Sequence, residues 1–259
     1  MIDISYFQEN NIHGDDSYFI HKTDEFLFVG LSDGVSSNRL GKVCSYLAME
    51  KIHMHISSKN FIENLRREID NQRDVKELIS SILEISLHEV MEDFKQNKIP
   101  AHFKEIVKQH QSDPKGTILI GIIDLINLNL YTYSLGDSEC WIIRNNSLQS
   151  HTGYLVSSSS NVLTTYFSLS DGIVGNPDIS SRKIYNKDII VFNTDGAKVT
   201  WTSKFGVQGV PFLKNLYANF TESAPNWIKF LKQNNLLQDD ATLVIVKIQQ
   251  TINNPTDKL

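Results

Sequence analysis

The stretch FLFVGLSDGVSS, residues 26–37, joins an apolar run to an Asp-Gly pair. The run over 26–31 has the length and composition of a buried β-strand. Asp33 and Gly34 follow it closely. Aspartate and glycine often end strands in turns, because Asp forms local hydrogen bonds and Gly adopts positive φ. Asp33 is therefore either a turn residue or a carboxylate held at a strand end for chemistry.

Aspartate also recurs at the ends of other predicted strands. Together with Asp33, five strand ends carry it, the others being Asp15-Asp16, Gly136-Asp137, Asp195-Gly196 and Asp239-Asp240. Each pair alone is most simply explained as a turn. Carboxylates that converge repel one another unless a cation neutralises them, and hard oxygen ligands suit Mg²⁺ or Mn²⁺. Two such ions about 4 Å apart can activate a water molecule and stabilise phosphoryl oxygens.

The order of the predicted elements indicates an α+β protein in which helices cover two packed sheets. Strands are expected at 17–21, 26–31, 116–124, 128–135, 140–144, 187–193 and 241–248, and helices at 40–56, 74–95, 212–220 and 225–234. Residues 1–250 are expected to form one domain, and residues 251–259 a polar C-terminal tail.

Composition narrows the class of protein. The 259-residue chain is 41% hydrophobic and carries a formal net charge of −5, which argues against a general nucleic-acid binder. Its two cysteines, Cys44 and Cys140, cannot build a disulfide framework and favour a reducing compartment. No signal peptide and no run of about 18 apolar residues is visible, so we expect a cytoplasmic protein without a membrane partner. Arg66-Arg67 is expected on a solvated face, and no pattern specifies an oligomeric state.

Six segments, in order, resemble the motifs of the metal-dependent Ser/Thr protein phosphatases of the PP2C (PPM) type, in a bacterial-like form. They are GDDSYF (14–19), VGLSDGVSS (29–37), KGTILIGIID (115–124), YSLGDSECWIIRNNSL (133–148), DIIVFNTDGAKVT (188–200) and DDATLVIVKI (239–248). The resemblance covers about residues 5–248, and the Gly-Asp-Ser segment is its most specific part. It implies a sandwich of two antiparallel sheets flanked by helix pairs.

The resemblance also implies a cofactor and its ligands. Family members hold two Mn²⁺ or Mg²⁺ ions, bridged by a water that attacks the phosphate. By position, Asp33 would bridge the two ions and the Gly34 carbonyl would bind one of them. Asp195 and Asp239 would hold the other ion, and Asp16 would bind directly or through water. Asp33, Asp195 and Asp239 are thus the expected catalytic set.

Three further features concern the metals and the substrate. Asp137 matches the aspartate that helps bind a third, weaker metal in bacterial members. Asp240 stands where the family usually has asparagine, beside the ligand at Asp239. The family carries a variable flap at the position of residues 153–181, so we expect the recognition segment there, with weak order in part of it.

The chain departs from the family in the residues expected to bind the phosphate group of the substrate. An arginine that grips the phosphate is usual four residues before the acidic pair, and Asn11 occupies that position. Arg and Asn are not equivalent, because the charged bidentate fork is lost. Ser36-Ser37 replaces the usual Gly-Gly. Arg39 is a candidate phosphate contact, and His13 is a candidate phosphate contact or general acid.

Three functions remain open at this point. The first is a metal-dependent protein phosphatase that hydrolyses phosphoserine and phosphothreonine, with a phosphoprotein substrate and a cognate Ser/Thr kinase as partners. The second is a pseudophosphatase that keeps the fold as a binding or regulatory module, which the loss at Asn11 supports. The third is a structural protein stabilised by Ca²⁺ or Mg²⁺. Retention of Asp33, Asp195 and Asp239 favours the enzyme.

Overall fold

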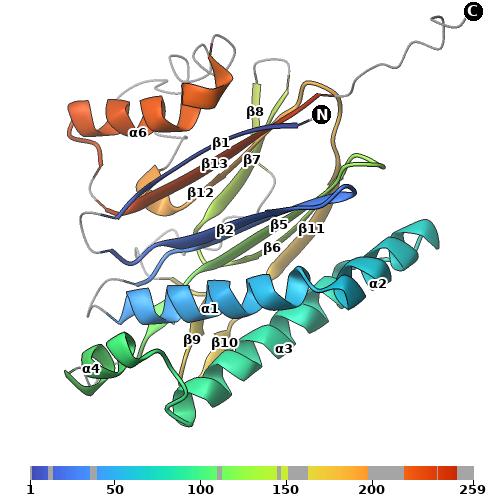
Figure 1. Ribbon diagram of the computed structural model, residues 1–259. Helices are drawn as coiled ribbons and strands as arrows, with labels where there is room; N and C mark the ends of the chain where they lie inside the picture. Colours follow the sequence, from blue (N-terminus) through green and yellow to red (C-terminus); the bar gives the residue numbers. More distant parts are fainter. Residues whose placement is uncertain are drawn as a thin grey trace, which may run out of the picture.

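Two five-stranded antiparallel sheets dominate the computed structural model, and a three-stranded sheet of order β10-β9-β4 accompanies them (Figure 1). The model describes residues 2–10, 14–35, 40–109, 113–144, 147–150, 163–197, 219–237 and 239–249. One large sheet has the order β1 (Ile2–Glu9), β13 (Ala241–Ile248), β12 (Ile189–Asn193), β7 (Glu139–Arg144) and β8 (Ser147–Ser150). The other has the order β11 (Asp178–Lys183), β6 (Asn129–Leu135), β5 (Ile118–Asp124), β3 (Phe26–Ser32) and β2 (Ser17–Lys22).

Helices lie on the outer faces of the sheets (Figure 1). α1 (Gly41–Ile56) and α3 (Lys76–Lys95) pack together on the β11–β2 sheet, as the expected helix pair. α2 (Lys59–Asp70) follows α1, and α4 (Ala101–Gln109) follows α3. On the other side, α6 (Ser223–Gln233) packs on the β1–β8 sheet. The α+β sandwich expected from the sequence is confirmed.

The buried side chains form three apolar layers, one between the sheets and one under the helices on each side. β3 contributes side chains to two of these layers, because successive side chains of a strand point to opposite faces of the sheet. Phe26 and Phe28 pack in the layer under α1 and α3, whereas Leu27 and Val29 pack between the sheets. Strands buried on both faces give continuous apolar runs instead of alternating patterns, which is why these strands are easy to find in the sequence.

Several elements were not predicted. β1 was missed, although it pairs along its whole length with β13. The segment 146–186, in which no helix or strand was predicted, contains β8, β9 (Tyr166–Ser168), β10 (Gly172–Val174) and β11. The helix expected at 212–220 lies mostly outside the described residues, and at its end Phe220 begins a short 3₁₀ turn, Phe220–Glu222. The tail at 251–259 and the flap residues up to 162 also lie outside the described residues.

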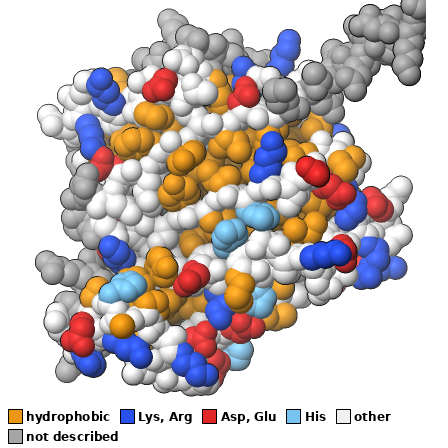
Figure 2. Space-filling model, in the orientation of Figure 1, with side chains coloured by type: hydrophobic (Ala, Val, Ile, Leu, Met, Phe, Trp, Pro, Cys, Tyr) orange, Lys and Arg blue, Asp and Glu red, His pale blue; other side chains and the backbone are white. Residues whose placement is uncertain are grey.

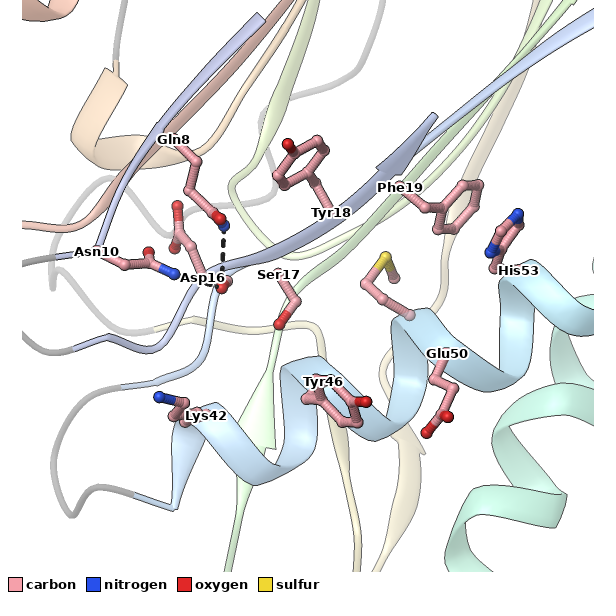
Figure 3. A pocket seen from close by; sticks show the side chains of 11 residues that line it. Gln8, Asn10, Asp16, Ser17, Tyr18, Phe19, Lys42, Tyr46, Glu50 and His53 are labelled. Carbon is pink, nitrogen blue, oxygen red and sulfur yellow. Dashed lines mark hydrogen bonds between the residues drawn. The ribbon is translucent and has the colours of Figure 1, made fainter. Parts of the chain in front are cut away.

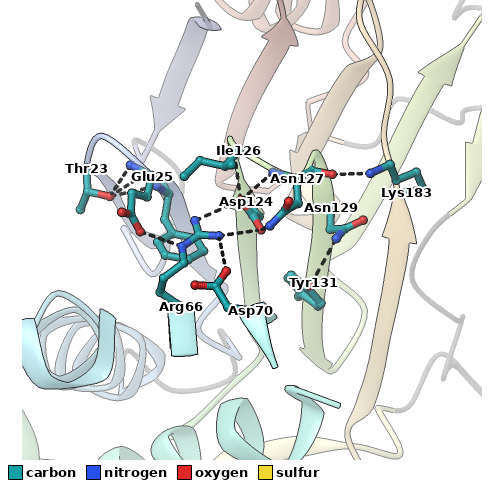
Figure 4. Close-up of polar contacts among 11 residues, drawn as sticks. Thr23, Glu25, Arg66, Asp70, Asp124, Ile126, Asn127, Asn129, Tyr131 and Lys183 are labelled. Carbon is teal, nitrogen blue, oxygen red and sulfur yellow. Dashed lines mark hydrogen bonds and ion pairs between the residues drawn. The ribbon is translucent and has the colours of Figure 1, made fainter. Parts of the chain in front are cut away.

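The expectation for Arg66-Arg67 is wrong for Arg66. Its side chain is only 15% exposed and binds Glu25 at 2.8 Å and the fully buried Asp124 at 3.2 Å (Figure 4). Asp124 also accepts hydrogen bonds from the backbone N–H groups of Ile126 and Asn127. Arg66 therefore ties α2 to the turn after β5, while Arg67 stays largely exposed. Within the parts of the chain just given, no helix is long and apolar enough to cross a membrane.

Candidate active site

Strand ends from both sheets surround a cavity of about 550 Å³. Asp33 follows β3, Asp137 lies between β6 and β7, Asp195 follows β12, and Asp239 precedes β13. All four line this cavity, together with Gly34. Five of the six residues predicted as metal ligands are thus brought to one cavity. The sixth, Asp16, lines a neighbouring groove, and its charge acts on Asp33.

Thr117 fixes the backbone of Asp33 at this place. The N–H of Thr117 donates to the Asp33 carbonyl at 2.8 Å, and the N–H of Asp33 donates to the Thr117 hydroxyl at 3.0 Å. The Ser32 hydroxyl donates to the Thr117 carbonyl at 2.6 Å, and the Thr117 and Ser138 hydroxyls lie 2.9 Å apart. Thr117 therefore joins the Asp-Gly segment to the hairpin that carries Asp137.

Gly34 allows two backbone segments to touch. A Cβ at Gly34 would lie 2.3 Å from the carbonyl carbon of Gly41, and a Cβ at Gly41 would lie 2.6 Å from that of Gly34. Gly34 also forms a β-bridge with Gly116, and its N–H donates to the Asp15 carbonyl at 3.2 Å. Because no side chain fits between the turn and the start of α1, glycine is required on both sides of this contact.

Asp16 is held by residues that flank the other predicted ligands. Its Oδ2 accepts hydrogen bonds from the Thr194 hydroxyl at 2.9 Å and the Thr242 hydroxyl at 2.7 Å. Asp240, which departs from the family's asparagine, accepts a hydrogen bond from the Asp15 N–H at 2.8 Å. The first acidic motif is therefore fastened to the Asp195 and Asp239 segments, and Asp240 has a structural partner.

Burial and mutual repulsion raise the pKa values of the central carboxyls. Burial raises the pKa of Asp33 well above its usual range, and the nearby charges of Asp16, Asp195 and Asp137 raise it further. Burial also raises the pKa of Asp16, to about 7, although its two threonine hydrogen bonds oppose the shift. A bound cation would lower both of these pKa values.

The donor set fits a hard cation. Oδ1 of Asp16 and Oδ1 of Asp195 are buried and have no hydrogen-bond partner within the described chain. In the same residues, no three acidic, histidine or cysteine side chains converge as a closed ligand cluster. The carboxylates instead lie along the wall of the cavity. Mg²⁺ typically keeps several waters and binds one or two carboxylates, so an open acidic wall of this kind suits it.

Residues missed by sequence reasoning complete the cavity wall. Leu163 and Tyr166 line it, so the segment expected to carry recognition does contribute to the cavity. Lys115 and Thr117 line the cavity as well. The sequence could have indicated both, because they belong to the Lys-Gly-Thr start of a segment that resembles a family motif. The candidate phosphate contacts His13 and Arg39 lie outside the described residues, as do Asn11 and Ser36-Ser37.

A second hollow of about 350 Å³ lies beside Asp16, between β1, β2 and α1. Figure 3 shows Gln8 and Asn10 reaching toward Asp16, whose carbonyl accepts hydrogen bonds from both, at 3.1 and 2.9 Å. Lys42 and Tyr46 of α1 form the opposite wall. Hydrophobic side chains gather on this face of the molecule (Figure 2). Tyr46, which lines the hollow, is 40% exposed, and Tyr6, which is 54% exposed, lies against Tyr18 of the same lining.

Comparisons with known proteins identify the fold. No protein-family sequence model matches the chain, and no curated protein matches it by sequence. Among solved structures, the serine/threonine phosphatase Stp1 from Staphylococcus aureus is 14% identical, with 96% of each chain covered and a TM-score of 0.71. The protein phosphatase PstP, in complex with two manganese ions, is 14% identical, with 96% of this chain and 99% of that one covered and a TM-score of 0.62.

A third similar structure is RsbX in complex with magnesium, which is 16% identical, with 96% of each chain covered and a TM-score of 0.56. Two of these three proteins were therefore solved with Mn²⁺ or Mg²⁺. The matches span nearly the whole chain at identities that establish a shared fold. The protein thus has the fold of the bacterial PP2C-type serine/threonine phosphatases.

Proposed function

We propose that the protein is a metal-dependent phosphatase that hydrolyses phosphoserine and phosphothreonine in proteins. The observation that carries this proposal is the position of Asp33 at a strand end, beside Asp16, Asp195 and Asp137 and at the wall of an open cavity. Carboxylates whose charges repel one another are costly to hold together, so a fold that brings these four close to one another has a use for a cation there.

Each of the acidic residues would have a defined role in binding the metal ions. Asp33, the Gly34 carbonyl, Asp195 and Asp239 would hold two Mn²⁺ or Mg²⁺ ions, and Asp137 would help to hold a third. Bound in this way, such ions supply an activated water and stabilise the charge on phosphoryl oxygens. Asp33, Asp195 and Asp239 are the catalytic set of this proposal. Asp16 would bind one of the ions directly or through water.

The supporting residues orient these acids. Thr117 fixes the Asp33 backbone through two hydrogen bonds. Thr194 and Thr242 both donate to one oxygen of Asp16, and its other oxygen is buried without a hydrogen-bond partner among the described residues. Preorganised ligands of this kind bind a metal without a further cost of ordering their own side chains.

The cavity and the composition support the proposed substrate class and location. A cavity of about 550 Å³ with Leu163 and Tyr166 in its wall has room for a phosphorylated side chain and its flanking backbone. The phosphoprotein would come from a Ser/Thr kinase in the same compartment. We propose the cytoplasm, which the buried, reduced Cys44 and Cys140 support.

The direct test is hydrolysis of p-nitrophenyl phosphate and of a phosphothreonine peptide with Mn²⁺, with Mg²⁺ and with EDTA. We expect turnover of both substrates with metal and none with EDTA. Turnover that persists in EDTA would contradict the proposal, because it would need chemistry that does not use these ions.

A pseudophosphatase is the second candidate. One observation favours it, namely Asn11 at the position of the family's arginine. Calorimetry separates the two candidates. Metal binding without turnover would establish the binding module, and Asn11→Arg would then be the variant that tests whether the missing charge is the reason.

A further inference from the structure

We propose that Lys115, together with the hydroxyl group of Tyr166, is the phosphate-binding pair of this cavity. The pair would bind the phosphoryl oxygens that face away from the acidic residues, in place of the charge that Asn11 does not provide. This inference rests on the proposed function, because it places the phosphate of the substrate in the same cavity. It adds residues that are not in the ligand set implied by the family resemblance.

Charge is the first reason. Among the described residues that line the cavity, Lys115 is the only basic one, and Asp33, Asp137, Asp195 and Asp239 line the same cavity. A phosphate dianion is repelled by carboxylates, even when two divalent ions partly neutralise them. A positive side chain on the same wall offsets this repulsion and donates charge-assisted hydrogen bonds to the dianion. Lysine binds phosphate as a point charge with three donors.

Backbone geometry is the second reason. Lys115 belongs to β4 (Lys115–Gly116), which lies between the Asp33 segment and β9. The N–H of Val35 donates to the Lys115 carbonyl at 3.0 Å, two residues after Asp33. On the other side, Lys115 pairs with Ser168 in the β4–β9 ladder. The lysine is therefore attached to the same backbone that positions Asp33.

The third reason is the contact with Tyr166. The Lys115 ammonium lies 3.4 Å from the Tyr166 hydroxyl and 4.7 Å from the centre of its ring. A cation held over an aromatic ring keeps its charge and loses some of its freedom. No carboxylate forms an ion pair with Lys115 in the described part of the chain, so its charge is available to a ligand. The hydroxyl adds a second donor beside it.

The adjacent groove supplies a matched control. Lys42 also lies near the acidic cluster, but it lines the hollow that contains Asp16, and the cavity of Asp33 does not include it. Lys42→Met removes the same charge from a neighbouring place. It therefore separates a specific phosphate contact at Lys115 from a general change in the electrostatic field.

The experiment compares wild type with Lys115→Met, Lys115→Arg, Tyr166→Phe and Lys42→Met, each loaded with Mn²⁺. Inhibition by inorganic phosphate gives Ki, a phosphothreonine peptide gives KM and kcat, and calorimetry gives Mn²⁺ affinity. For Lys115→Met we expect Ki and KM to rise about 10-fold to 100-fold, the effect of losing a hydrogen bond to a charged group. We expect a smaller rise for Tyr166→Phe, partial recovery in Lys115→Arg, and unchanged Mn²⁺ affinity throughout.

Three results would overturn the inference. They are an unchanged Ki in Lys115→Met, an equal rise in Lys42→Met, and a Lys115→Met effect that follows entirely from weaker Mn²⁺ binding. If the wild type proves to have no turnover, phosphate binding to the Mn²⁺-loaded protein is measured by calorimetry alone. Binding that is lost in Lys115→Met would then support the pair although the proposed enzyme fails, and no binding to wild type would overturn both.

Discussion

The backbone of Asp33 is bound in both directions by Thr117, which donates to its carbonyl at 2.8 Å and accepts from its N–H at 3.0 Å. The two residues are 84 positions apart in the chain. Asp33 is thus held by a second segment and is not simply the end of its own strand. The Thr117 side chain is also within 2.9 Å of the Ser138 hydroxyl, next to Asp137.

Thr117→Val is predicted to lower both stability and metal affinity. The substitution keeps the shape of the side chain but leaves the partly buried N–H of Asp33 without its acceptor, which costs about 1–3 kcal/mol. Urea unfolding and Mn²⁺ calorimetry measure the two effects. Thr132→Val is the control, because Thr132 is equally buried and bonds the Ser180 hydroxyl away from the cavity. Equal losses of metal affinity in both variants would refute a specific role for Thr117.

Gly196→Ala is predicted to disrupt the site through the backbone. A Cβ at Gly196 would lie 2.0 Å from the Asp240 carbonyl oxygen, so the segment beside Asp239 has to move. Gly30→Ala is a matched control, since its Cβ would lie 2.1 Å from the Phe19 ring at the edge of the other sheet. Both variants should lose about 1–3 kcal/mol of stability. Only Gly196→Ala should also lose Mn²⁺ affinity, and intact binding in that variant would count against the assigned site.

The pKa of Asp16 predicts how the stability of the metal-free protein changes with pH. The folded-state pKa is about 7, whereas an unfolded chain has an Asp pKa of about 3.9. Between these values the folded protein binds more protons, so its free energy of unfolding falls as pH rises. The slope is at most about 1.4 kcal/mol per pH unit for one group. The loss begins above about pH 4 and is complete above about pH 7.

Urea unfolding in EDTA at pH 5, 6 and 7 measures this dependence. Wild type should lose stability over the range, and Asp16→Asn, which carries no titrating group there, should show a shallower loss. Saturating Mn²⁺ should remove or reverse the trend, because metal binds the ionised acids and competes with protons. An identical pH dependence in wild type and Asp16→Asn would show that Asp16 titrates normally.

Arg66→Met is predicted to destabilise the fold without changing the cavity. The variant removes the cation beside Asp124, which is 0% exposed, and leaves a buried charge that keeps only its backbone and Asn127 hydrogen bonds. We expect a loss of about 2–4 kcal/mol, largely recovered when Asp124→Asn is added. Arg67→Met, at a side chain 66% exposed, should cost less than about 0.5 kcal/mol. A neutral Arg66→Met would show that the ion pair does not stabilise the protein.

Strands buried on both faces, and the acids at their ends, could be predicted from the sequence. β3, β5 and β13 are continuous apolar runs, and Asp33 and Asp239 adjoin two of them. The meeting of these strand ends at one cavity depends on the tertiary fold, which composition and periodicity do not reveal. The resemblance to a known family supplied it, and the structure places Asp33, Asp137, Asp195 and Asp239 together.

Short or polar elements could not be predicted for physical reasons. β1 has the sequence IDISYFQE and is an edge strand, so only part of it is buried and its apolar pattern is weak. β4 has two residues and β9 three, too few for any period. The meeting of Lys115 with Tyr166 depends on that pairing. Arg66 looked solvated because its neighbours in sequence are charged, whereas its partner Asp124 comes from β5.

The measurement that decides most is Mn²⁺-dependent hydrolysis of a phosphothreonine peptide by wild type, Asp33→Asn, Asp195→Asn and the exposed control Asp24→Asn. We predict turnover by wild type and Asp24→Asn, and a loss of about 100-fold or more in the other two variants, because each would remove a ligand that stabilises charge in the transition state. Turnover by Asp33→Asn at the wild-type rate, or a wild type that neither binds Mn²⁺ nor hydrolyses the peptide, would return Asp33 to the role of a turn residue.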